Sequence, residues 1–206
     1  GVIISRTEPD DARVHLLTEQ NMPFVTHGRT AMGIEHPYHD FDNETFAFGA
    51  VEQLVKRGRK RIALLPPPSK LTYYQHTFDG FMRGLRAFGA EEVPLHINID
   101  APLGQIRSAV EALMRGPDAP DGLISSSGSS AIAANAGIEA AGKRVGAEID
   151  LVAKQGTPIL SWIRPDIIAV YEDVRQSGRE LAKAVIARID GVDPELLQSV
   201  SEPRWE

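Results

Sequence analysis

Short, strongly apolar runs alternate along this chain with longer segments in which apolar residues recur at helical spacing. This alternation is typical of βα units, which place parallel strands side by side and cover the sheet with helices. The run 1–5 is the first of these apolar stretches. The segment 42–57 is the clearest helical pattern, because Phe46, Ala50 and Leu54 fall on one helical face. The sequence therefore predicts an α/β fold in which parallel sheets are flanked by helices.

The same patterns predict an order of elements along the chain. The predicted strands cover residues 1–5, 23–27, 61–65, 95–99, 122–126, 150–154 and 167–171, with a possible short strand at 198–200. The predicted helices cover residues 10–20, 42–57, 77–88, 104–115, 129–141 and 174–190.

Three successive prolines follow the strand at 61–65, and proline cannot continue a central strand. We therefore expect the chain to cross between two lobes at 66–69. Residues 1–65 would then form the remainder of an N-terminal lobe and the start of the crossover. Residues 66–170 would form a C-terminal lobe, and 171–206 a final helix and tail returning toward the lobe interface. Two strands and two helices are too few to bury a two-sided parallel sheet, so we expect the first lobe to be incomplete.

Composition and charge narrow the range of functions. The formal net charge is −6, and because duplex affinity depends on Lys and Arg neutralising phosphates, we do not expect this chain to bind nucleic acid by itself. The basic run 56–61 falls where a helix is predicted to end, where cations are favoured, and is interpreted as a solvated helix end. The absence of cysteine fits a reducing cytoplasm. No apolar run is long enough to span a bilayer, so no membrane partner is expected.

Polar side chains gather where the predicted strands end. Ligands of open parallel sheets bind beyond these carboxyl ends. Sugars suit such a wall, because their hydroxyls pair with planar polar groups and their C–H faces stack on aromatic rings. We expect a small polyhydroxy ligand between the lobes, bound by residues from the set Ser5, Arg6, His27, Arg29, Tyr73, Tyr74, His76, Asp100, Ser127, Lys154, Gln155, Trp162 and Glu172.

Each of these candidates also has a purely structural interpretation. Arg6 and Arg29 could form surface salt bridges, which contribute little to stability. His27 could be a buried imidazole, and the aromatic residues near the hinge could pack the wall of the cleft. The serine-rich run 125–130 could in part cap the following helix. Trp162 could belong to the core or to a dimer contact. These alternatives stay open at this point.

An enzyme is a different possibility. His36, His39, Asp40 and Asp42 are close enough in sequence to suggest a metal cluster. However, Pro37 interrupts the group, and Asp42 is better placed as a helix cap. The serine run lacks a G-x-S-x-G elbow, and no G-x-G-x-x-G motif follows a predicted strand. We therefore predict no enzymatic activity, no catalytic residues, no metal and no cofactor.

Six groups of segments carry further signatures, in a fixed order along the chain. They are 1–5 with 22–25, 38–43, 54–64, 79–81 with Leu85, 145–146 with 150–152, and 172–173 with Gly178, Leu181 and Ala182. Together, over nearly the whole chain, they resemble the LacI/GalR family of bacterial transcription regulators.

The resemblance implies a periplasmic-binding-protein-like fold of two Rossmann-like lobes with a small effector, here a sugar or a related compound, between them. It also implies homodimers in the cytoplasm and effector-controlled affinity for operator DNA. The DNA would be read by an N-terminal helix-turn-helix domain, which is not in this sequence. Family members have a sensor domain longer by roughly two βα units, which agrees with a thin first lobe. A periplasmic sugar-binding receptor of a transport system is the alternative, because fold does not fix function.

The sequence departs from the family pattern at three positions where the resemblance implies effector contacts. The family's arginine before the Gly-Phe pair falls on Thr77, its Asn-Asp pair falls on Ser127-Gly128, and its later aspartate falls on Gln155. The loss of these groups predicts a different or less polar sugar, such as a glucoside or an oligosaccharide.

Overall fold

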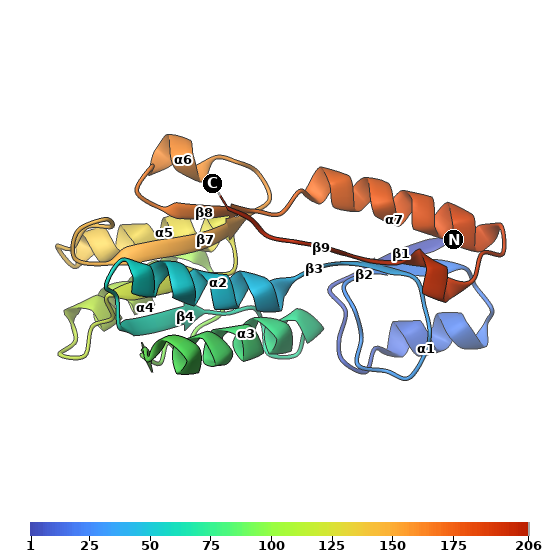
Figure 1. The fold of residues 1–206 in the computed structure, drawn as a ribbon, viewed down its shortest axis with the longest axis horizontal. Coiled ribbons are helices and arrows are strands. Elements are labelled where there is room, and N and C mark those ends of the chain that lie inside the picture. The colour runs from blue at the N-terminus through green and yellow to red at the C-terminus, as the bar shows by residue number, and fades with distance from the viewer. Residues whose placement is uncertain (206) are drawn as a thin grey trace.

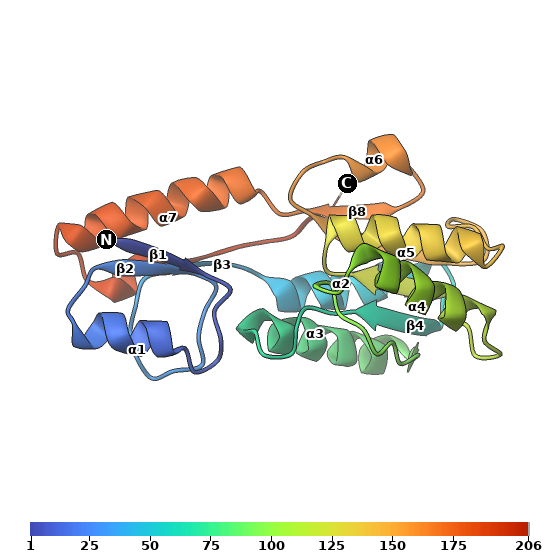
Figure 2. The ribbon, with the colours of Figure 1, turned by 180° about the vertical axis from the view of Figure 1, so that it is seen from behind.

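The computed structural model describes residues 1–205 and shows two lobes side by side (Figure 1). The first lobe has a four-stranded parallel sheet in the order β1-β2-β3-β9. Helix α1 lies on one side of this sheet and α7 on the other (Figures 1 and 2). The bounds are β1 (Val2–Ser5), α1 (Ala12–Glu19), β2 (Phe24–His27), β3 (Tyr38–Phe41), α7 (Val174–Ile189), η1 (Pro194–Leu197) and β9 (Gln198–Ser201).

The second lobe has a six-stranded sheet in the order β10-β8-β7-β6-β4-β5, in which only the edge strand β10 is antiparallel to its neighbour. Its strands are β4 (Arg61–Leu65), β5 (Glu91–Glu92), β6 (Gly122–Ser125), β7 (Asp150–Gln155), β8 (Ile168–Tyr171) and β10 (Arg204–Trp205). Its helices are α2 (Asn43–Lys56), α3 (Thr72–Phe88), α4 (Leu103–Arg115), α5 (Gly128–Ala140) and α6 (Leu160–Ile163).

Two apolar cores lie on the two faces of the second sheet. Phe46 of α2 and Phe81 of α3 are fully buried in one, and Ile106 of α4 and Ile138 of α5 in the other. The first lobe has a smaller core around Val14. No helix within residues 1–205 combines the length and the apolar character that crossing a membrane requires.

The chain passes between the lobes at three places, between β3 and α2, between β8 and α7, and between β9 and β10. The crossing expected at 66–69 is therefore not observed, and β4 belongs to the second lobe rather than to the first. The prolines end β4 without changing the sheet, since the carbonyl of Pro66 still accepts a hydrogen bond from the backbone of Ile99 at 2.9 Å.

Several other elements differ from the sequence prediction. Strand β3 was not predicted, because its buried residues His39 and Asp40 are polar and the segment therefore lacks the apolar pattern of a buried strand. Helix α3 starts at Thr72 instead of 77, with no side-chain cap to mark its beginning. The strand expected at 95–99 does not form. Its apolar side chains pack on the core from a loop, and the place beside β4 is taken by β5 at Glu91–Glu92. The short strand near 198–200 is confirmed as β9.

Candidate ligand-binding site

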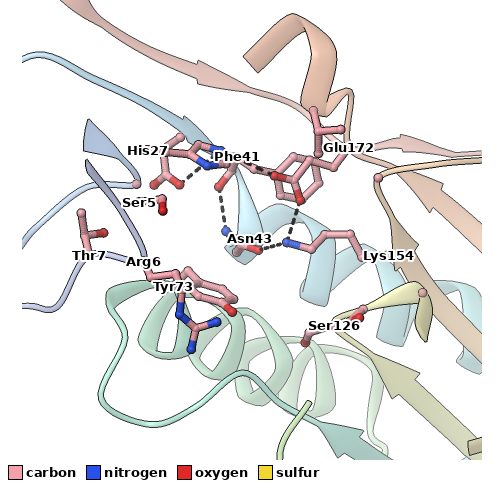
Figure 3. Close-up of a pocket in the computed structure, with 16 residues that line it drawn as sticks. Ser5, Arg6, Thr7, His27, Phe41, Asn43, Tyr73, Ser126, Lys154 and Glu172 are labelled. Carbon is pink, nitrogen blue, oxygen red and sulfur yellow. Dashed lines mark hydrogen bonds and ion pairs between the residues drawn. The ribbon is translucent and has the colours of Figure 1, made fainter. Parts of the chain in front are cut away.

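A cavity of about 290 Å³ lies between the lobes, where the carboxyl ends of β1, β2 and β3 face those of β6, β7 and β8 (Figure 3). Both lobes contribute to its wall. The lining residues are Ser5, Arg6, Thr7, His27, Gly28, Asp40, Phe41, Asn43, Tyr73, Ser126, Ser127, Gly128, Lys154, Gly156, Glu172 and Val174. Of the residues proposed from the sequence, the cavity thus brings together Ser5, Arg6, His27, Tyr73, Ser127, Lys154 and Glu172.

A buried polar network holds the deep end of the cavity. Lys154 of β7 places its Nζ 2.9 Å from an Oε of Glu172 and donates a hydrogen bond to Asn43 Oδ1 at 2.8 Å (Figure 3). The same ammonium lies 4.7 Å from the centre of the Phe41 ring. The lysine and glutamate side chains are only 10% and 14% exposed, so each needs the other as a partner. Burial alone would raise the pKa of Glu172, but the adjacent Lys154 lowers it below its ordinary value.

Two histidines connect this network to the first lobe. His27 Nε2 lies 3.9 Å from the other carboxylate oxygen of Glu172. The His27 ring stacks on His39, its neighbour in the parallel sheet, with 6.5 Å between ring centres. His39 in turn shares a 2.8 Å hydrogen bond with Ser199 Oγ. Burial, and then the nearby His27, lower the pKa of His39, so its neutral form is favoured.

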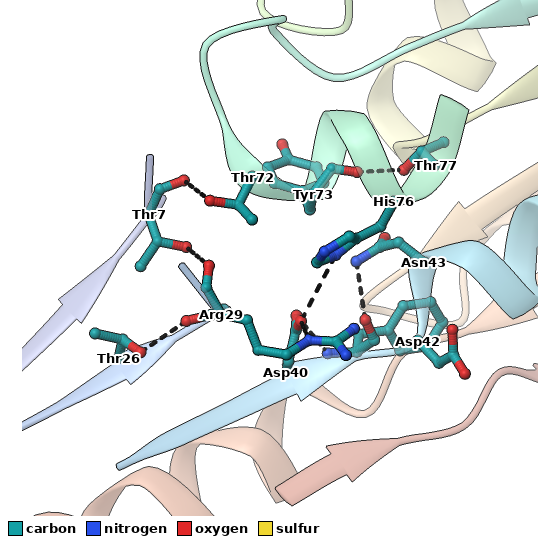
Figure 4. Close-up of polar contacts among 12 residues, drawn as sticks. Thr7, Thr26, Arg29, Asp40, Asp42, Asn43, Thr72, Tyr73, His76 and Thr77 are labelled. Atoms are coloured by element: carbon teal, nitrogen blue, oxygen red, sulfur yellow. Dashed lines mark hydrogen bonds and ion pairs between the residues drawn. The ribbon is translucent and has the colours of Figure 1, made fainter. Parts of the chain in front are cut away.

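A second polar cluster lies behind Asp40 (Figure 4). Arg29 Nε donates a 2.7 Å hydrogen bond to Asp40 Oδ2, and His76 Nδ1 lies 3.9 Å from the same oxygen. Burial and then Arg29 lower the pKa of His76. Only Asp40 of these three lines the cavity. The structure thus places Arg29 and His76, which the sequence suggested as ligand contacts, outside the wall, where Arg29 holds Asp40 through its hydrogen bond.

Direct contacts also join the lobes beside this cluster. The backbone and the hydroxyl of Thr72 both donate to the carbonyl of Thr7, at 2.9 and 3.2 Å. Thr7 donates its own hydroxyl to the carbonyl of Arg29 at 2.9 Å (Figure 4). Gly28 has a φ of +106°, and a Cβ at this position would lie 2.6 Å from Thr7 Oγ1. The close approach of these loops thus requires glycine.

The mouth of the cavity carries an ion pair between the lobes. Arg6, just after β1, contacts the carboxylate of Asp100, which lies in the loop before α4. The two side chains are 52% and 43% exposed. Tyr73 of α3 is next to Arg6 in the wall, and burial raises the pKa of its phenol (Figure 3). Asp100 does not line the cavity and acts there through Arg6.

The serine-rich end of β6 forms another part of the wall. Helix α5 begins at Gly128, with Ser127 in the capping position but without a side-chain cap. Ser126 is buried, and its hydroxyl has no hydrogen-bond partner within residues 1–205. The helix cap considered for the serine run is therefore not formed by the N-cap side chain, and the hydroxyl of Ser129 lies 3.0 Å from that of Ser127.

The structure places three further candidates away from the cavity wall. Tyr74 follows Tyr73 on the helix and stacks on Phe78, with 5.8 Å between ring centres. Gln155 follows Lys154 on the strand and accepts hydrogen bonds from the backbone of the next loop, at Ile159 and Leu160. Trp162 is 88% exposed on α6. Gln155 lies on the opposite face of β7 from Lys154, because side chains alternate along a strand, and Tyr74 is turned away from Tyr73 around the helix.

Sequence reasoning missed Asp40, Phe41 and Asn43 as lining residues because β3 was not recognised. The rule of polar strand ends would have found them once this strand was assigned. His39 and Asp40 are consecutive on β3 and face opposite sides of the sheet, and Asp42 caps α2. Within residues 1–205, no three histidine or acidic side chains come together in a way that could hold a metal ion.

These features define a class of protein, the two-lobed α/β binding domain with a small polar cavity between its sheets. The family model of the periplasmic binding protein-like domain matches residues 51–205. The chain belongs to this family, and its fold is similar to that of LacI-family regulators. The predicted fold class and the resemblance to LacI/GalR regulators are therefore confirmed.

Similar proteins agree with this assignment. The transcriptional regulator RafR of Escherichia coli is 30% identical over 205 residues, which cover 98% of this chain and 61% of RafR. A LacI-family regulatory protein from Chloroflexus aggregans superposes with a TM-score of 0.88 at 21% identity, covering 98% of this chain and 73% of that chain. A complex of the regulator CelR with cellobiose superposes with a TM-score of 0.87 at 24% identity, covering 100% and 64%. The chain thus spans about three fifths of RafR.

Proposed function

We propose that this chain binds a sugar in the cavity between its lobes and is the effector-binding part of a LacI-type transcription regulator. The observation that carries the proposal is the composition of the wall. Hydroxyl and amide groups of Ser5, Ser126 and Asn43 stand there beside the rings of Phe41 and Tyr73. Sugars need both kinds of surface, polar groups for their hydroxyls and rings for their C–H faces. The cellobiose bound to the similar regulator CelR supports a carbohydrate ligand.

The hydroxyl of Ser126, which has no hydrogen-bond partner among the described residues, strengthens the proposal. A buried polar group without a partner costs about 1–3 kcal/mol. A ligand hydroxyl that bonds to Ser126 would remove this cost, because the side chain is buried in the wall. The cavity of about 290 Å³ is at the small end of ligand pockets, which span roughly 300–1,000 Å³. This size limits the enclosed part of the ligand, and it is compatible with a glucoside or with one end of a short oligosaccharide.

The regulator would work by a shift of lobe closure. A sugar that contacts both lobes binds the closed arrangement better, and it moves the equilibrium by that difference in affinity. In a homodimer, lobe rotation would change the spacing of two DNA-binding heads that must match operator half-sites. The exposed Trp162 and Ile163 of α6 offer an apolar contact for a second copy. Curated relatives such as RafR are transcriptional regulators, which favours this function in the cytoplasm over a transport receptor or an enzyme.

Calorimetric titration of the 206-residue chain tests the ligand class. The panel is cellobiose, maltose, glucose and ribose, with adenosine as a ligand that is not a simple sugar. We expect saturable binding of at least one sugar. Replacing Ser126 by Ala should weaken that binding about fivefold, the value of one hydrogen bond. Ser108→Ala is the control, because Ser108 is exposed on α4 and lies outside the wall. Binding of adenosine alone, or of nothing in the panel, would contradict the proposal.

A further inference from the structure

We propose that Asp100 makes this site selective for uncharged ligands by neutralising Arg6 at the mouth of the cavity. The inference rests on the proposed function, since it specifies which sugars the cavity accepts. It predicts that neutral saccharides bind, whereas sugar phosphates and acidic sugars are rejected. Asp100 is a positioning residue in this scheme, because it does not line the cavity and acts through Arg6.

The charges around the cavity balance in three pairs. Lys154 is paired with Glu172 inside the wall. Asp40, also in the wall, is paired with Arg29 behind it. The third pair is formed by Arg6, which lines the cavity, and Asp100, which lies outside the wall. Without Asp100 the wall would present one uncompensated guanidinium, a group suited to bidentate binding of phosphate or carboxylate.

The backbone holds Arg6 in a defined place. Its φ is +58°, a left-handed conformation that is uncommon for residues other than glycine. The guanidinium of Arg13 donates to the carbonyls of Ser5 and Arg6 at 3.2 and 3.1 Å. Arg13 is itself fixed by Asp11, whose pKa it lowers to about 2. These hydrogen bonds fix the backbone of the loop that carries Arg6. The Arg6 side chain therefore extends toward the cavity from a fixed Cα position.

The partner carboxylate is held on the other lobe. The backbone of Asp100 donates to Asn98 Oδ1 at 2.9 Å, and the preceding residue Ile99 is tied to the carbonyl of Pro66. The Arg6 Nη1 atom lies 3.4 Å from Asp100 Oδ1, and Nη2 contacts the second carboxylate oxygen. The ion pair consequently joins the two lobes across the cavity in this arrangement. An anionic ligand would face both a guanidinium whose charge is already paired with a carboxylate and the nearby negative charge of that carboxylate.

The test compares an anion with a neutral sugar on the 206-residue chain and its variants. Inorganic phosphate is titrated by calorimetry at low ionic strength, together with the neutral sugar of the panel that binds most tightly. We expect Asp100→Asn to bind phosphate about fivefold more tightly than the unmodified chain, which corresponds to about 1 kcal/mol. Asp100→Glu should restore the rejection of phosphate. Adding Arg6→Gln to Asp100→Asn should abolish the gain.

Glu139→Gln is the matched control. Glu139 pairs with Arg164 at 2.6 Å, and the two side chains are 44% and 47% exposed, close to the values for Asp100 and Arg6. This pair lies within the second lobe, away from the cavity wall. The control should leave phosphate affinity unchanged. Asp100→Ser provides a second uncharged variant, and thermal unfolding verifies that each variant folds.

The outcomes separate the two proposals. If Asp100→Asn and Asp100→Ser bind phosphate no better than the unmodified chain, the selectivity role is wrong, whatever the sugars do. If the gain survives without Arg6, the anion binds elsewhere and the role is also wrong. If phosphate affinity rises as expected but no neutral sugar binds, the electrostatic role stands and the carbohydrate ligand is rejected.

Discussion

The two ends of the cavity hold their charges in different ways. At the deep end, Lys154 and Glu172 are nearly buried, and Lys154 also donates a hydrogen bond to Asn43. At the mouth, Arg6 and Asp100 are about half exposed and face solvent. Water screens the outer pair and hardly reaches the inner one. The inner pair should therefore govern folding, whereas the outer pair should govern which ligands enter.

Removing the buried cation is the strongest test of this comparison. Lys154→Met would leave Glu172 in the wall without its ammonium partner. Such a loss costs about 3 kcal/mol or more in unfolding free energy. Urea denaturation measures the change, with Lys183→Met as control, because the Lys183–Glu180 pair lies on the surface of α7 with its lysine 71% exposed. Equal effects of the two substitutions would show that burial does not distinguish these pairs.

The same variant should reverse one part of the pH dependence. The pKa of Glu172 is lowered in the folded chain, so its contribution to stability is present above the unfolded pKa and is lost as pH falls through the folded value. Without Lys154, burial raises this pKa instead. Acidification from about pH 6 to pH 4.5 should then narrow the stability gap between Lys154→Met and the unmodified chain. A gap that widens on acidification would argue against the pairing.

Aromatic residues at the cavity provide the next comparison. Tyr73 lines the wall, whereas its neighbour Tyr74 stacks on Phe78. Tyr73→Ala should weaken sugar binding about fivefold, since a ring contact is worth about 0.5–1.5 kcal/mol beyond the buried area. Tyr74→Ala should leave the affinity unchanged. Calorimetry with the best-binding sugar measures both, and a similar loss in the two variants would show that the assignment of the wall is wrong.

This pair of tyrosines also shows which parts of the cavity wall can be predicted from the sequence. The alternation of apolar runs and helical patterns predicts the sheets, and the rule of strand ends predicts most of the wall. It cannot choose between Tyr73 and Tyr74, because the start of α3 has no cap to fix which residue faces the cleft. It equally cannot choose between Lys154 and Gln155, which point to opposite faces of β7. That choice depends on where each element begins and on what packs against it.

The missed strand β3 has a similar cause. A buried strand is expected to be apolar, yet His39 and Asp40 are both about 4% exposed and polar. The Nδ1 atom of His39 shares a hydrogen bond with Ser199, distant in sequence, and Asp40 accepts one from Arg29 on another loop. Such partners become visible only after the fold brings them together. Because this strand was not predicted, Phe41 at its end and Asn43 just after it were not predicted as lining residues either.

Substitution of His39 should have a smaller effect on the unfolding free energy than Lys154→Met and a larger effect than Asp100→Asn. Its folded pKa is lowered by burial and by His27, so the unfolded chain binds more protons near pH 6. Stability should therefore decrease as pH falls below about 6.5, with a slope under the limit of about 1.4 kcal/mol per pH unit for one proton. His39→Gln should flatten this slope. Some slope should remain, because the pKa of His76 is shifted in the same direction.

The smallest expected effect concerns the outer pair itself. Exposed ion pairs contribute between about 0 and 1 kcal/mol to stability. Asp100→Asn should therefore change the unfolding free energy by about 0.5 kcal/mol or less, similar to Glu139→Gln, while changing phosphate affinity far more than that control does. Urea denaturation at low and high salt measures the first quantity. A loss of stability as large as that of Lys154→Met would mean that Arg6 and Asp100 hold the lobes together, and the division between a structural deep end and a selective mouth would be wrong.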